Sequence, residues 1–226
     1  MLLKDKVAII TGGAGVNGLG FASARMMAAQ GARVVILDLD KAQPASVAAT
    51  LGQQHMGVVA DVTNKASCDA AIKAVMEKFG QIDILFNNAG ITQPRKTMEI
   101  SAADYEAVLD VSLRGALYMS QAVLPHMRAR KQGSIICTSS VSAQRGGGIL
   151  GGPHYSAAKA GVLGLARAMA RECGVDNIRV NCITPGLIET DINKGLIPAD
   201  RMTDILSNIP MNRIGEPMTW LAVSCS

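Results

Sequence analysis

Aromatic side chains are scarce in this chain of 226 residues, of which Phe, Trp and Tyr together make up 3%. Glycine and methionine are frequent instead, with 23 and 12 residues, so we expect a core of small, closely packed side chains. The net charge of +4 comes without any basic run interleaved with aromatics. The sequence therefore predicts no nucleic-acid surface.

Long apolar runs are also missing. The apolar opening at residues 7–10 is far shorter than the roughly 20 residues that a membrane-spanning helix needs. It is also too short for the apolar part of a signal peptide. We therefore expect a cytoplasmic protein without a membrane partner. The length predicts one domain over residues 1–226 with a sizeable core.

The cysteines are few and scattered, and no two of them form a C-x-x-C pair. They are Cys68, Cys137, Cys173, Cys182 and Cys225. This spacing is typical of small buried side chains in a reducing compartment. Clusters of His, Cys and acidic residues with the spacing of metal ligands are absent as well, so a site without metal is predicted.

The amino-terminal part contains a strand, a glycine-rich turn, a helix, a second strand and an acid. Residues 7–10 and 33–37 are short apolar runs typical of buried strands, and residues 21–30 form the helix between them. Backbone N–H groups at the start of such a helix can hold a pyrophosphate. Asp38 follows the glycines by about 20 residues, where an acid binds the hydroxyls of an adenosine ribose. Its charge would repel a 2′-phosphate, which favours NAD over NADP.

The glycines of this turn fit two registers. Gly13, Gly15 and Gly18 fit G-x-G-x-x-G. Gly12 followed by Gly18 and Gly20 fits a longer loop. Both registers, and hence the amides that would contact phosphate, stay open at the level of sequence.

Apolar strands and helices continue to alternate along the chain. Further elements are predicted as strands at 56–60, 82–86, 134–137 and 178–183 and as helices at 65–79, 153–172 and, in two segments, 102–131. This alternation predicts an α/β fold of the Rossmann type, a doubly wound parallel sheet in three layers. Ligands of such sheets bind at the carboxyl ends of the strands. Polar or turn residues stand at those ends here: Gly12, Asp38, Asp61, Asn88, Ser140 and Pro185.

Tyr155 and Lys159 form the most suggestive pair in the sequence. They are four residues apart, so on a helix they share one face. A phenol normally keeps its proton up to about pH 10, and a neighbouring ammonium favours the phenolate. The pair therefore predicts a proton donor and acceptor that works near neutral pH.

Together these features resemble the short-chain dehydrogenase/reductase (SDR) family over nearly the whole chain. The matching segments are Thr11-Gly12, Asp38, Asp61-Val62, Asn87-Asn88-Ala89-Gly90, Ser139-Ser140, Tyr155-x-x-x-Lys159 and Asn181-x-x-x-Pro185-Gly186. The resemblance implies one domain that binds a nicotinamide cofactor and catalyses hydride transfer between an alcohol and a ketone. With Asp38, the expected cofactor is NAD.

The resemblance also implies roles for individual residues. Tyr155 would be the acid/base, Lys159 would lower its pKa and bind the nicotinamide ribose, and Ser140 would bind the substrate oxygen. Ser112 stands where the family usually has the Asn of a proton relay to the lysine, and it completes the catalytic set. The implied cofactor-binding residues are Gly12, Gly15, Gly18, Leu19, Asp38, Asp61, Val62, Asn88, Ala89, Gly90, Tyr155, Lys159, Pro185, Gly186 and Thr190.

Three local features depart from the family pattern. The glycine loop is two residues longer than the family's. The family's serine also lies two residues closer to its tyrosine, so Ser140 matches by local motif and Ser142 by count. We favour Ser140 and assign the extra residues to the glycine-rich loop at 146–152. Ser112 is shorter than the usual Asn, so the relay is expected to be rebuilt or weakened.

The end of the chain departs most. Residues 213–217 resemble the family's segment before its last core helix, but no further strand or D-G-G-like turn follows. We expect that the native ending is missing or replaced after about Met218, so that the sheet lacks the family's last strand. The strand at 178–183 would then be an unpaired edge.

A small secondary alcohol or ketone is the predicted substrate. Gln93, Gln144, Arg145 and His154 favour a polyol or a sugar-derived compound, although we expect His154 to be a rim residue without a chemical role. A 3-oxoacyl thioester is the alternative substrate. An NAD-binding or interaction protein with impaired catalysis is the alternative from another class. The family also implies a homodimer or homotetramer.

Overall fold

A parallel sheet forms the centre of the computed structural model, which describes residues 1–147, 150–192, 195, 197 and 199–218. Within these residues the sheet has six strands: β1 (Val7–Thr11), β2 (Arg33–Asp38), β3 (Met56–Val59), β4 (Ile84–Asn87), β5 (Gly133–Thr138) and β6 (Ile178–Ile183). Their order is β3-β2-β1-β4-β5-β6, and all neighbours pair in parallel. The chain reverses its direction of travel across the sheet between β1 and β4, where doubly wound proteins bind their ligands.

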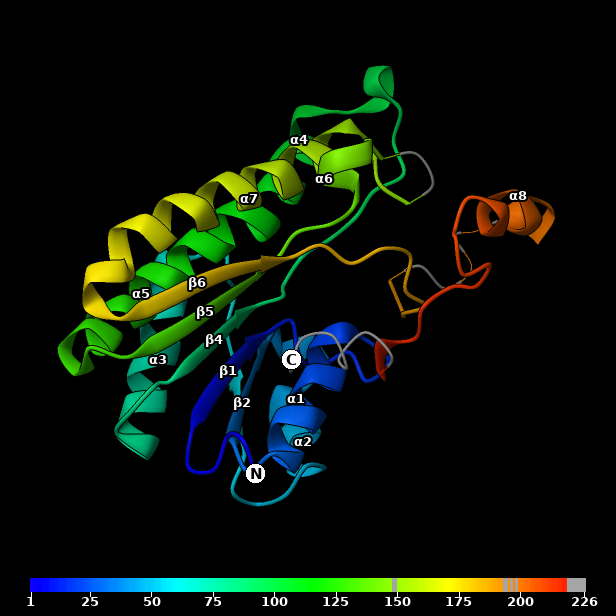
Figure 1. Cartoon of the computed structure of the whole chain (residues 1–226). Helices are drawn as coiled ribbons and strands as arrows, with labels where there is room; N and C mark the ends of the chain where they lie inside the picture. Colours follow the sequence, from blue (N-terminus) through cyan, green and yellow to red (C-terminus); the bar gives the residue numbers. More distant parts are fainter. Residues whose placement is uncertain (148–149, 193–194, 196, 198, 219–226) are drawn as a thin grey trace.

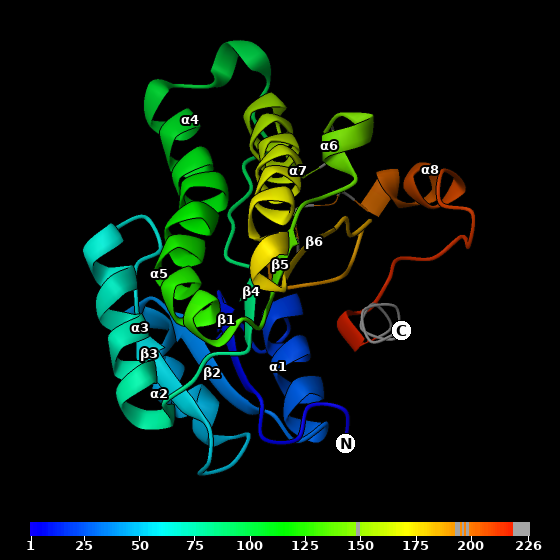
Figure 2. The same cartoon turned by 60° about the vertical axis from the view of Figure 1, so that its left-hand side comes forward.

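Helices cover both faces of the sheet (Figures 1 and 2). The α-helices of the described residues are α1 (Leu19–Ala29), α2 (Pro44–Ala49), α3 (Lys65–Phe79), α4 (Ala102–Leu109), α5 (Gly115–Arg130), α6 (Ser142–Arg145), α7 (Pro153–Cys173) and α8 (Met202–Ser207). Side chains of α3, α5 and α7 pack in one core cluster, and those of α1 and α2 pack in another on the opposite face. The predicted doubly wound α/β fold in three layers is confirmed.

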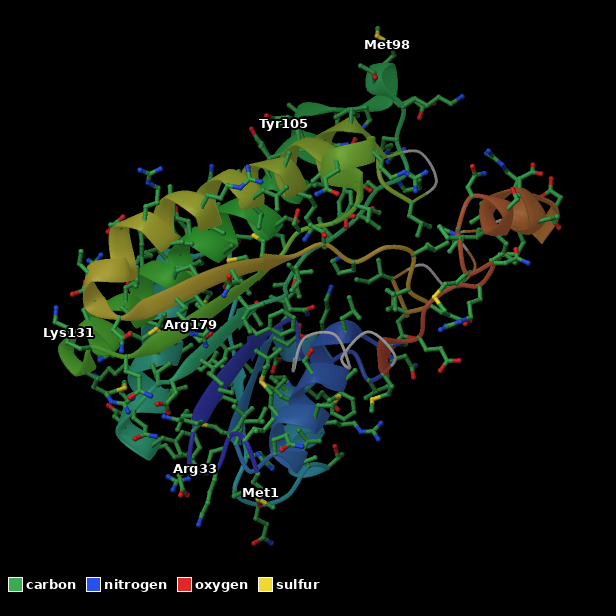
Figure 3. All side chains as sticks on the ribbon, in the orientation of Figure 1. Met1, Arg33, Met98, Tyr105, Lys131 and Arg179 are labelled. Carbon is green, nitrogen blue, oxygen red and sulfur yellow. The ribbon has the colours of Figure 1, made fainter. Side chains whose placement is uncertain are left out.

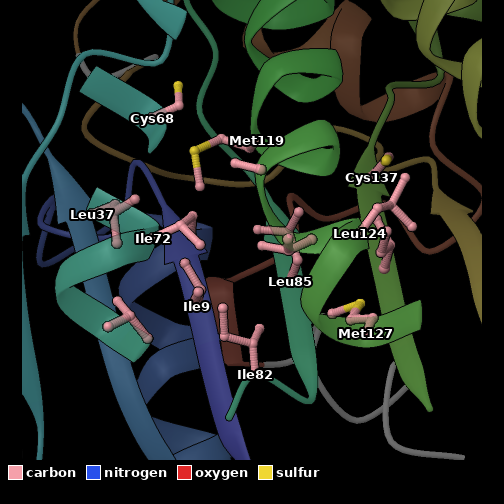
Figure 4. Packing of buried hydrophobic residues seen from close by; sticks show 14 of the residues in the cluster. Ile9, Leu37, Cys68, Ile72, Ile82, Leu85, Met119, Leu124, Met127 and Cys137 are labelled. Carbon is pink, nitrogen blue, oxygen red and sulfur yellow. The ribbon is translucent and has the colours of Figure 1, made fainter. Parts of the chain in front are cut away.

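The strands of the sheet are apolar on both faces because each face is covered. Along β1, Val7 and Ile9 point into the α3–α5–α7 cluster, whereas Ala8 and Ile10 point toward α1 and α2. Figure 4 shows the first cluster, in which Leu85 of β4 lies among side chains of α5. Truncating a fully buried side chain such as Leu85 to alanine typically costs about 2–5 kcal/mol.

The two ends of the sheet differ in what they carry. Arg33 and Lys131 mark the end where strands begin, and the exposed Met98 stands at the far end of the molecule (Figure 3). The glycine loop and the residues after β4, β5 and β6 all belong to the end where strands finish. Because the strands are parallel, the predicted site residues gather at this one edge.

The connection between α4 and α5 is a π-helical turn at Asp110–Arg114 (η3), which the sequence did not predict. The two helical segments expected at 102–131 are confirmed, but they run through this turn without a break. Single π-turns inside helices are frequent at functional sites. Here that region holds the buried Ser112.

The edge strand β6 pairs only with β5 among the described residues. After β6 the chain forms a parallel bridge between Ile188 and Gly215 and carries α8, which stands away from the sheet in both views. Residues from Thr219 onward lie outside the described residues. The predicted loss of a last strand stays a prediction.

None of the helices in the described ranges is long and apolar enough to cross a membrane. The cytoplasmic location stays a prediction from the sequence.

Candidate active site

Tyr155 and Lys159 lie on the first turns of α7, as their spacing predicted. The helix begins at Pro153 after the cap residue Gly152, and Lys159 Nζ lies 5.8 Å from the centre of the Tyr155 ring. Lys159 is only 4% exposed, and its ammonium donates a hydrogen bond of 2.9 Å to the carbonyl of Thr138 at the end of β5. The pair therefore faces the sheet edge where the strands end.

Burial shifts the pKa values of both Tyr155 and Lys159. It lowers the pKa of Lys159 to about 8, so the side chain still carries its proton at neutral pH but loses it more readily than an exposed lysine. Burial also raises the pKa of Tyr155, and a hydrogen bond with Ser140 opposes this rise. The expected lowering of the Tyr155 pKa is therefore wrong, because burial of the phenol raises the pKa by more than the hydrogen bond with Ser140 lowers it.

Ser140 is the serine that lies against Tyr155. It is buried two residues after the end of β5, and its Oγ accepts a hydrogen bond of 3.1 Å from the backbone N–H of Ser142. Ser142 starts the short helix α6. The neighbouring Ser139 donates to the carbonyl of Lys159 at 2.7 Å, which fixes α7 against this end of β5. The structure thus brings Ser140, Tyr155 and Lys159 together.

Ser112 lies beside this group. It is 3% exposed in the π-turn η3, and its Oγ has no hydrogen-bond partner among the described residues. A Cβ added at Gly90 would lie 3.2 Å from Lys159 Nζ and 3.4 Å from Ser112 Oγ. The two polar atoms therefore flank the same small space next to Gly90.

The glycine loop between β1 and α1 is packed most closely at Gly12 and Gly20, two glycines of the longer register. Gly12 has a φ of +62°, and a Cβ there would lie 2.9 Å from the Cα of Ala89. A Cβ at Gly20 would lie 2.5 Å from the carbonyl oxygen of Gly12, so the helix start packs directly against the loop. A Cβ at Gly15, by contrast, would meet nothing within 4 Å. Gly20 thus joins the loop's essential glycines.

The start of α1 suits a diphosphate. Its cap residue is Gly18, which offers no side chain to the first N–H groups, and Leu19 opens the helix. Uncapped amides at a helix start, together with the helix dipole, form an anion-binding site. The loop residues present here therefore fit the pyrophosphate of a dinucleotide cofactor.

Thr11 and Asn88 hold the loop to the end of β4. Thr11 Oγ1 accepts hydrogen bonds of 3.0 Å from the N–H groups of Asn88 and Ala89. The amide of Asn88 donates to the carbonyls of Thr11 at 3.1 Å and Gly12 at 3.0 Å. The sequence prediction missed this role of Thr11, although its position before Gly12 was the available signal.

Asp38 is the last residue of β2, and Asp61 lies two residues after the end of the neighbouring strand β3. Asp38 accepts a hydrogen bond of 3.0 Å from the N–H of Ala14 and thereby joins β2 to the glycine loop. Asp61 accepts from the N–H of Thr63 at 2.9 Å and stays exposed. Val62 is buried in the core cluster, where it packs against Gly115.

The segment after β6 reaches back to the site. The carbonyl of Pro185 accepts a hydrogen bond of 3.0 Å from the N–H of Val141, close to Ser140. Gly186 and Thr190 follow on the same segment, and the next residue, Asp191, accepts a hydrogen bond of 2.9 Å from the amide of Asn17. The glycine loop and this segment are therefore linked across the sheet edge.

The expected rim position of His154 is wrong, whereas its lack of a chemical role stays a prediction. It is 2% exposed rather than at the rim, and its Nε2 lies 3.1 Å from Oε1 of Gln93. A Cβ at Gly152 would lie 2.3 Å from the carbonyl oxygen of Arg95 and 3.0 Å from the Nδ1 of His154, so the glycine before α7 lets both approach closely. Two of the four polar residues that favoured a polyol substrate are thus paired with one another.

Metal ligands do not gather in the part of the chain that the structure describes, where no group of three or more His, Cys, Asp or Glu residues could hold an ion. A mechanism without metal stays a prediction.

Known proteins resemble this chain over nearly its full length. A family profile described as enoyl-(acyl carrier protein) reductase matches residues 12–224. The chain is 53% identical over 220 residues to an uncharacterized short-chain type dehydrogenase/reductase, y4mP, of Sinorhizobium fredii, covering 96% of this chain and 87% of that protein. It is 41% identical to the (2S)-[(R)-hydroxy(phenyl)methyl]succinyl-CoA dehydrogenase subunit BbsD of Thauera aromatica, covering 96% and 86%. It is 37% identical to the 3-oxoacyl-[acyl-carrier-protein] reductase FabG of Vibrio cholerae, covering 96% and 87%.

Solved structures agree with these relatives. The crystal structure of gox2181 has a TM-score of 0.92 at 33% identity, covering 98% of this chain and 88% of that one. The 3-ketoacyl-(acyl-carrier-protein) reductase from Brucella melitensis, complexed with NADH, has a TM-score of 0.89 at 32% identity, covering 99% and 92%. The parallel six-stranded sheet fits these matches, and the chain belongs to the short-chain dehydrogenase/reductase family of oxidoreductases.

Proposed function

We propose that this chain transfers a hydride between NAD(H) and a secondary alcohol or ketone, with 3-hydroxyacyl and 3-oxoacyl thioesters as its substrates. The observation that carries the proposal is the meeting of Ser140, Tyr155 and Lys159 at the carboxyl edge of the sheet. An alcohol that is oxidised must lose a proton as well as a hydride, and this group can take the proton. A bound nicotinamide ring would supply the hydride chemistry.

Each of the three residues has a distinct part in the proposal. Ser140 Oγ donates a hydrogen bond to the substrate oxygen and holds it beside the Tyr155 hydroxyl. The phenol oxygen of Tyr155 exchanges the proton with that oxygen. The charge of Lys159 stabilises the phenolate and binds a ribose hydroxyl, and its pKa of about 8 keeps this charge at neutral pH. Ser112 stands in the space behind Lys159, where it would pass protons onward.

The proposed preference for NAD is based on Asp38. Its carboxylate lies at the end of β2 beside the glycine loop, where it accepts a hydrogen bond from Ala14. An adenosine ribose with two free hydroxyls can donate to such a carboxylate, whereas a 2′-phosphate would be repelled. Asp61 and Val62 would border the adenine, Asn88, Ala89 and Gly90 the nicotinamide ribose, and Pro185, Gly186 and Thr190 the carboxamide end.

The substrate class rests on two observations. Relatives at 37–41% identity are named for CoA and acyl-carrier-protein thioesters. The sequence argument for a polyol substrate is weaker, because His154 is buried and paired with Gln93. Reductive synthesis of 3-hydroxyacyl thioesters would be expected to use NADPH, but their oxidation can use NAD, so this substrate class is compatible with Asp38.

Two further expectations belong to this proposal. A homodimer or homotetramer remains the expected assembly, to be measured by size in solution. The competing function is a nucleotide-binding protein with impaired catalysis, which is favoured by the short Ser112 at the relay position.

An assay of the reduced full chain with NAD separates these functions. Short-chain 3-hydroxyacyl-CoA esters and a set of polyols are offered in parallel, and the formation of NADH is followed. Turnover of the thioesters that falls about 10²–10⁴-fold in Tyr155→Phe, with NADH binding retained, is expected for an acid/base residue. Tyr105→Phe on the exposed face of α4 is the matched control and should keep full activity. Binding of NADH without turnover of any substrate would contradict the proposal.

A further inference from the structure

Two cysteines lie side by side on neighbouring strands close to the active site. Cys137 of β5 and Cys182 of β6 are direct partners in the parallel register. Neighbouring strands are about 4.8 Å apart, and disulfides join residues whose Cα atoms are about 4.4–6.8 Å apart. Cys137 lies in the core cluster beneath α7, and Cys182 packs against the same cluster with its thiol 3.7 Å from the carbonyl of Val162. The backbone therefore already holds this pair at a distance that a disulfide can span.

The two thiols are not equivalent. Cys137 is fully buried, and its pKa is raised by the hydrogen bond with Cys182 and by burial. Cys182 is only half-buried, and its pKa is lowered by the hydrogen bond from Cys137 and by the charges of Arg167 and Lys159. The reactive form of cysteine is the thiolate, and accessible thiolates next to a second thiol oxidise most readily. Cys182 has the features of an attacking thiol and Cys137 those of a resolving one.

The other cysteines of the described chain lack these features. Cys68 is buried, has no cysteine partner, and its pKa is raised to about 11 by burial. Cys173 is buried as well, and burial raises its pKa. Cys225 lies outside the described residues. Cys68 and Cys173 thus serve as internal controls for thiol reactivity.

We propose that Cys137 and Cys182 are an oxidation site, in which a peroxide converts the two thiols into a disulfide. The thiolate of Cys182 attacks one oxygen of hydrogen peroxide, the O–O bond breaks, and the leaving hydroxide is protonated to water. The resulting sulfenic acid is attacked at sulfur by Cys137, and its hydroxyl leaves as a second water. The two thiols together lose two electrons and two protons, and the peroxide is reduced to two waters.

The pair sits directly behind the catalytic lysine. Thr138, whose carbonyl holds the Lys159 ammonium, follows Cys137 in the chain. Cys182 Sγ in turn lies 3.7 Å from the carbonyl of Val162 on α7, one turn after Lys159. A bond between the two sulfurs would shift the Thr138 carbonyl that holds Lys159 and the turn of α7 that follows Lys159, so oxidation should lower turnover. This consequence, unlike the oxidation itself, rests on the proposed function.

Mass spectrometry tests the oxidation without any activity assay. The reduced full chain is exposed to hydrogen peroxide, free thiols are alkylated, and the peptides are mapped under non-reducing conditions. We expect a loss of about 2 Da, since a disulfide forms with the loss of two hydrogens, and a linked peptide that contains Cys137 and Cys182. The link should vanish in Cys182→Ser and persist in Cys68→Ser, with the melting temperature of each variant measured to verify folding.

Two results would overturn the oxidation site. One is a native protein in which Cys137 and Cys182 are both alkylated after peroxide treatment, in wild type and in Cys68→Ser alike. The other is a linkage of either residue to Cys225 in place of the pair. Should Cys182→Ser fail to fold, Cys182→Ala serves the same test.

Turnover provides the second readout. The oxidised protein is expected to lose at least half of its activity and to regain it with dithiothreitol, while Cys182→Ser keeps its activity in peroxide. Full activity of a chain that carries the mapped disulfide would overturn the link to Lys159. A reduced chain without any activity, yet with the disulfide after oxidation, would contradict the proposed function and leave the oxidation site standing.

Discussion

At the edge where the strands begin, the buried carboxylate of Asp83 is surrounded by donors, whereas the buried ammonium of Lys159 at the other edge has few partners. Asp83, which is 4% exposed, accepts hydrogen bonds from the N–H of Val7 and from Gln81 at 2.9 Å each and from Arg130 at 3.2 Å. Lys159 donates to one carbonyl among the described residues, that of Thr138.

The same contrast holds for neutral groups. Buried polar atoms without a partner in the described residues include Ser112 Oγ and His154 Nδ1, both on the side of the active site. Native proteins leave few such atoms, and each has an energetic penalty. The edge where the strands begin therefore stabilises the fold, whereas the edge where they end holds groups for chemistry and loses stability by doing so.

The largest effect on stability is expected from Asp83→Ala. It would leave the N–H of Val7 and the guanidinium of Arg130 without their acceptor, and removing one partner of a buried pair typically costs about 3–5 kcal/mol. Urea unfolding would measure this loss. The control is Asp69→Ala, which breaks an exposed ion pair with Lys65 on α3 and should change stability by about 0.5 kcal/mol or less. Equal losses of unfolding free energy in the two variants would contradict the stabilising role of Asp83.

Lys159→Met is expected to act in the opposite direction. Burial of the ammonium lowers its pKa from 10.5 to about 8, which corresponds to a folding penalty of about 3 kcal/mol at neutral pH. The variant leaves the Thr138 carbonyl unpaired, which offsets about 1–2 kcal/mol. We therefore expect a gain of about 1–2 kcal/mol in unfolding free energy together with loss of turnover. A destabilised variant would contradict the view that this edge gives up stability.

The pH dependence of stability tests the same folding penalty of the buried Lys159. Because the pKa of Lys159 is lower in the folded chain than in the unfolded chain, the unfolded state binds more protons between about pH 8 and pH 10.5. The stability of the wild type should therefore rise across this window relative to Lys159→Met, whereas the penalty is fully present below pH 8. A stability difference between the two proteins that stays constant from pH 7 to pH 10.5 would contradict a folding penalty from the charge of Lys159.

The smallest effect is expected from Asn17→Ala. The exposed bond from Asn17 to Asp191 joins the glycine loop to the segment after β6. Exposed hydrogen bonds contribute about 0.5–1.5 kcal/mol, so NADH should dissociate a few times faster from the variant. Stopped-flow fluorescence measures that rate, and the double variant with Asp191→Ala should add nothing further. Additive effects would mean that the two residues act separately.

Local signals predicted the regular elements well. The helix at Lys65–Phe79 and the strand at Ile178–Ile183 have the predicted bounds. For the helix, the Asn64 side chain caps the first turn and Gly80 ends the last in a left-handed conformation, so both limits are written in neighbouring residues. The alternation of strands and helices was enough to predict the parallel sheet.

Features that depend on contacts between distant segments were not predicted. The burial of His154 depends on Gln93 and Gly152, and the pairing of Cys137 with Cys182 depends on the register of two strands. The π-turn around Ser112 has no local sequence signal. The raised pKa of Tyr155 results from the packing of α7 against the sheet, which spacing along a helix does not reveal.

The first measurement is a fluorescence titration of the full chain with NADH, repeated with NADPH and with Asp38→Ser. It asks whether the carboxyl edge of the sheet binds a nicotinamide dinucleotide, on which the whole account depends. We predict saturable binding of NADH, at least tenfold weaker binding of NADPH, and a reduced difference between the two in the variant. Binding of neither cofactor, or a preference of the wild type for NADPH, would contradict the account.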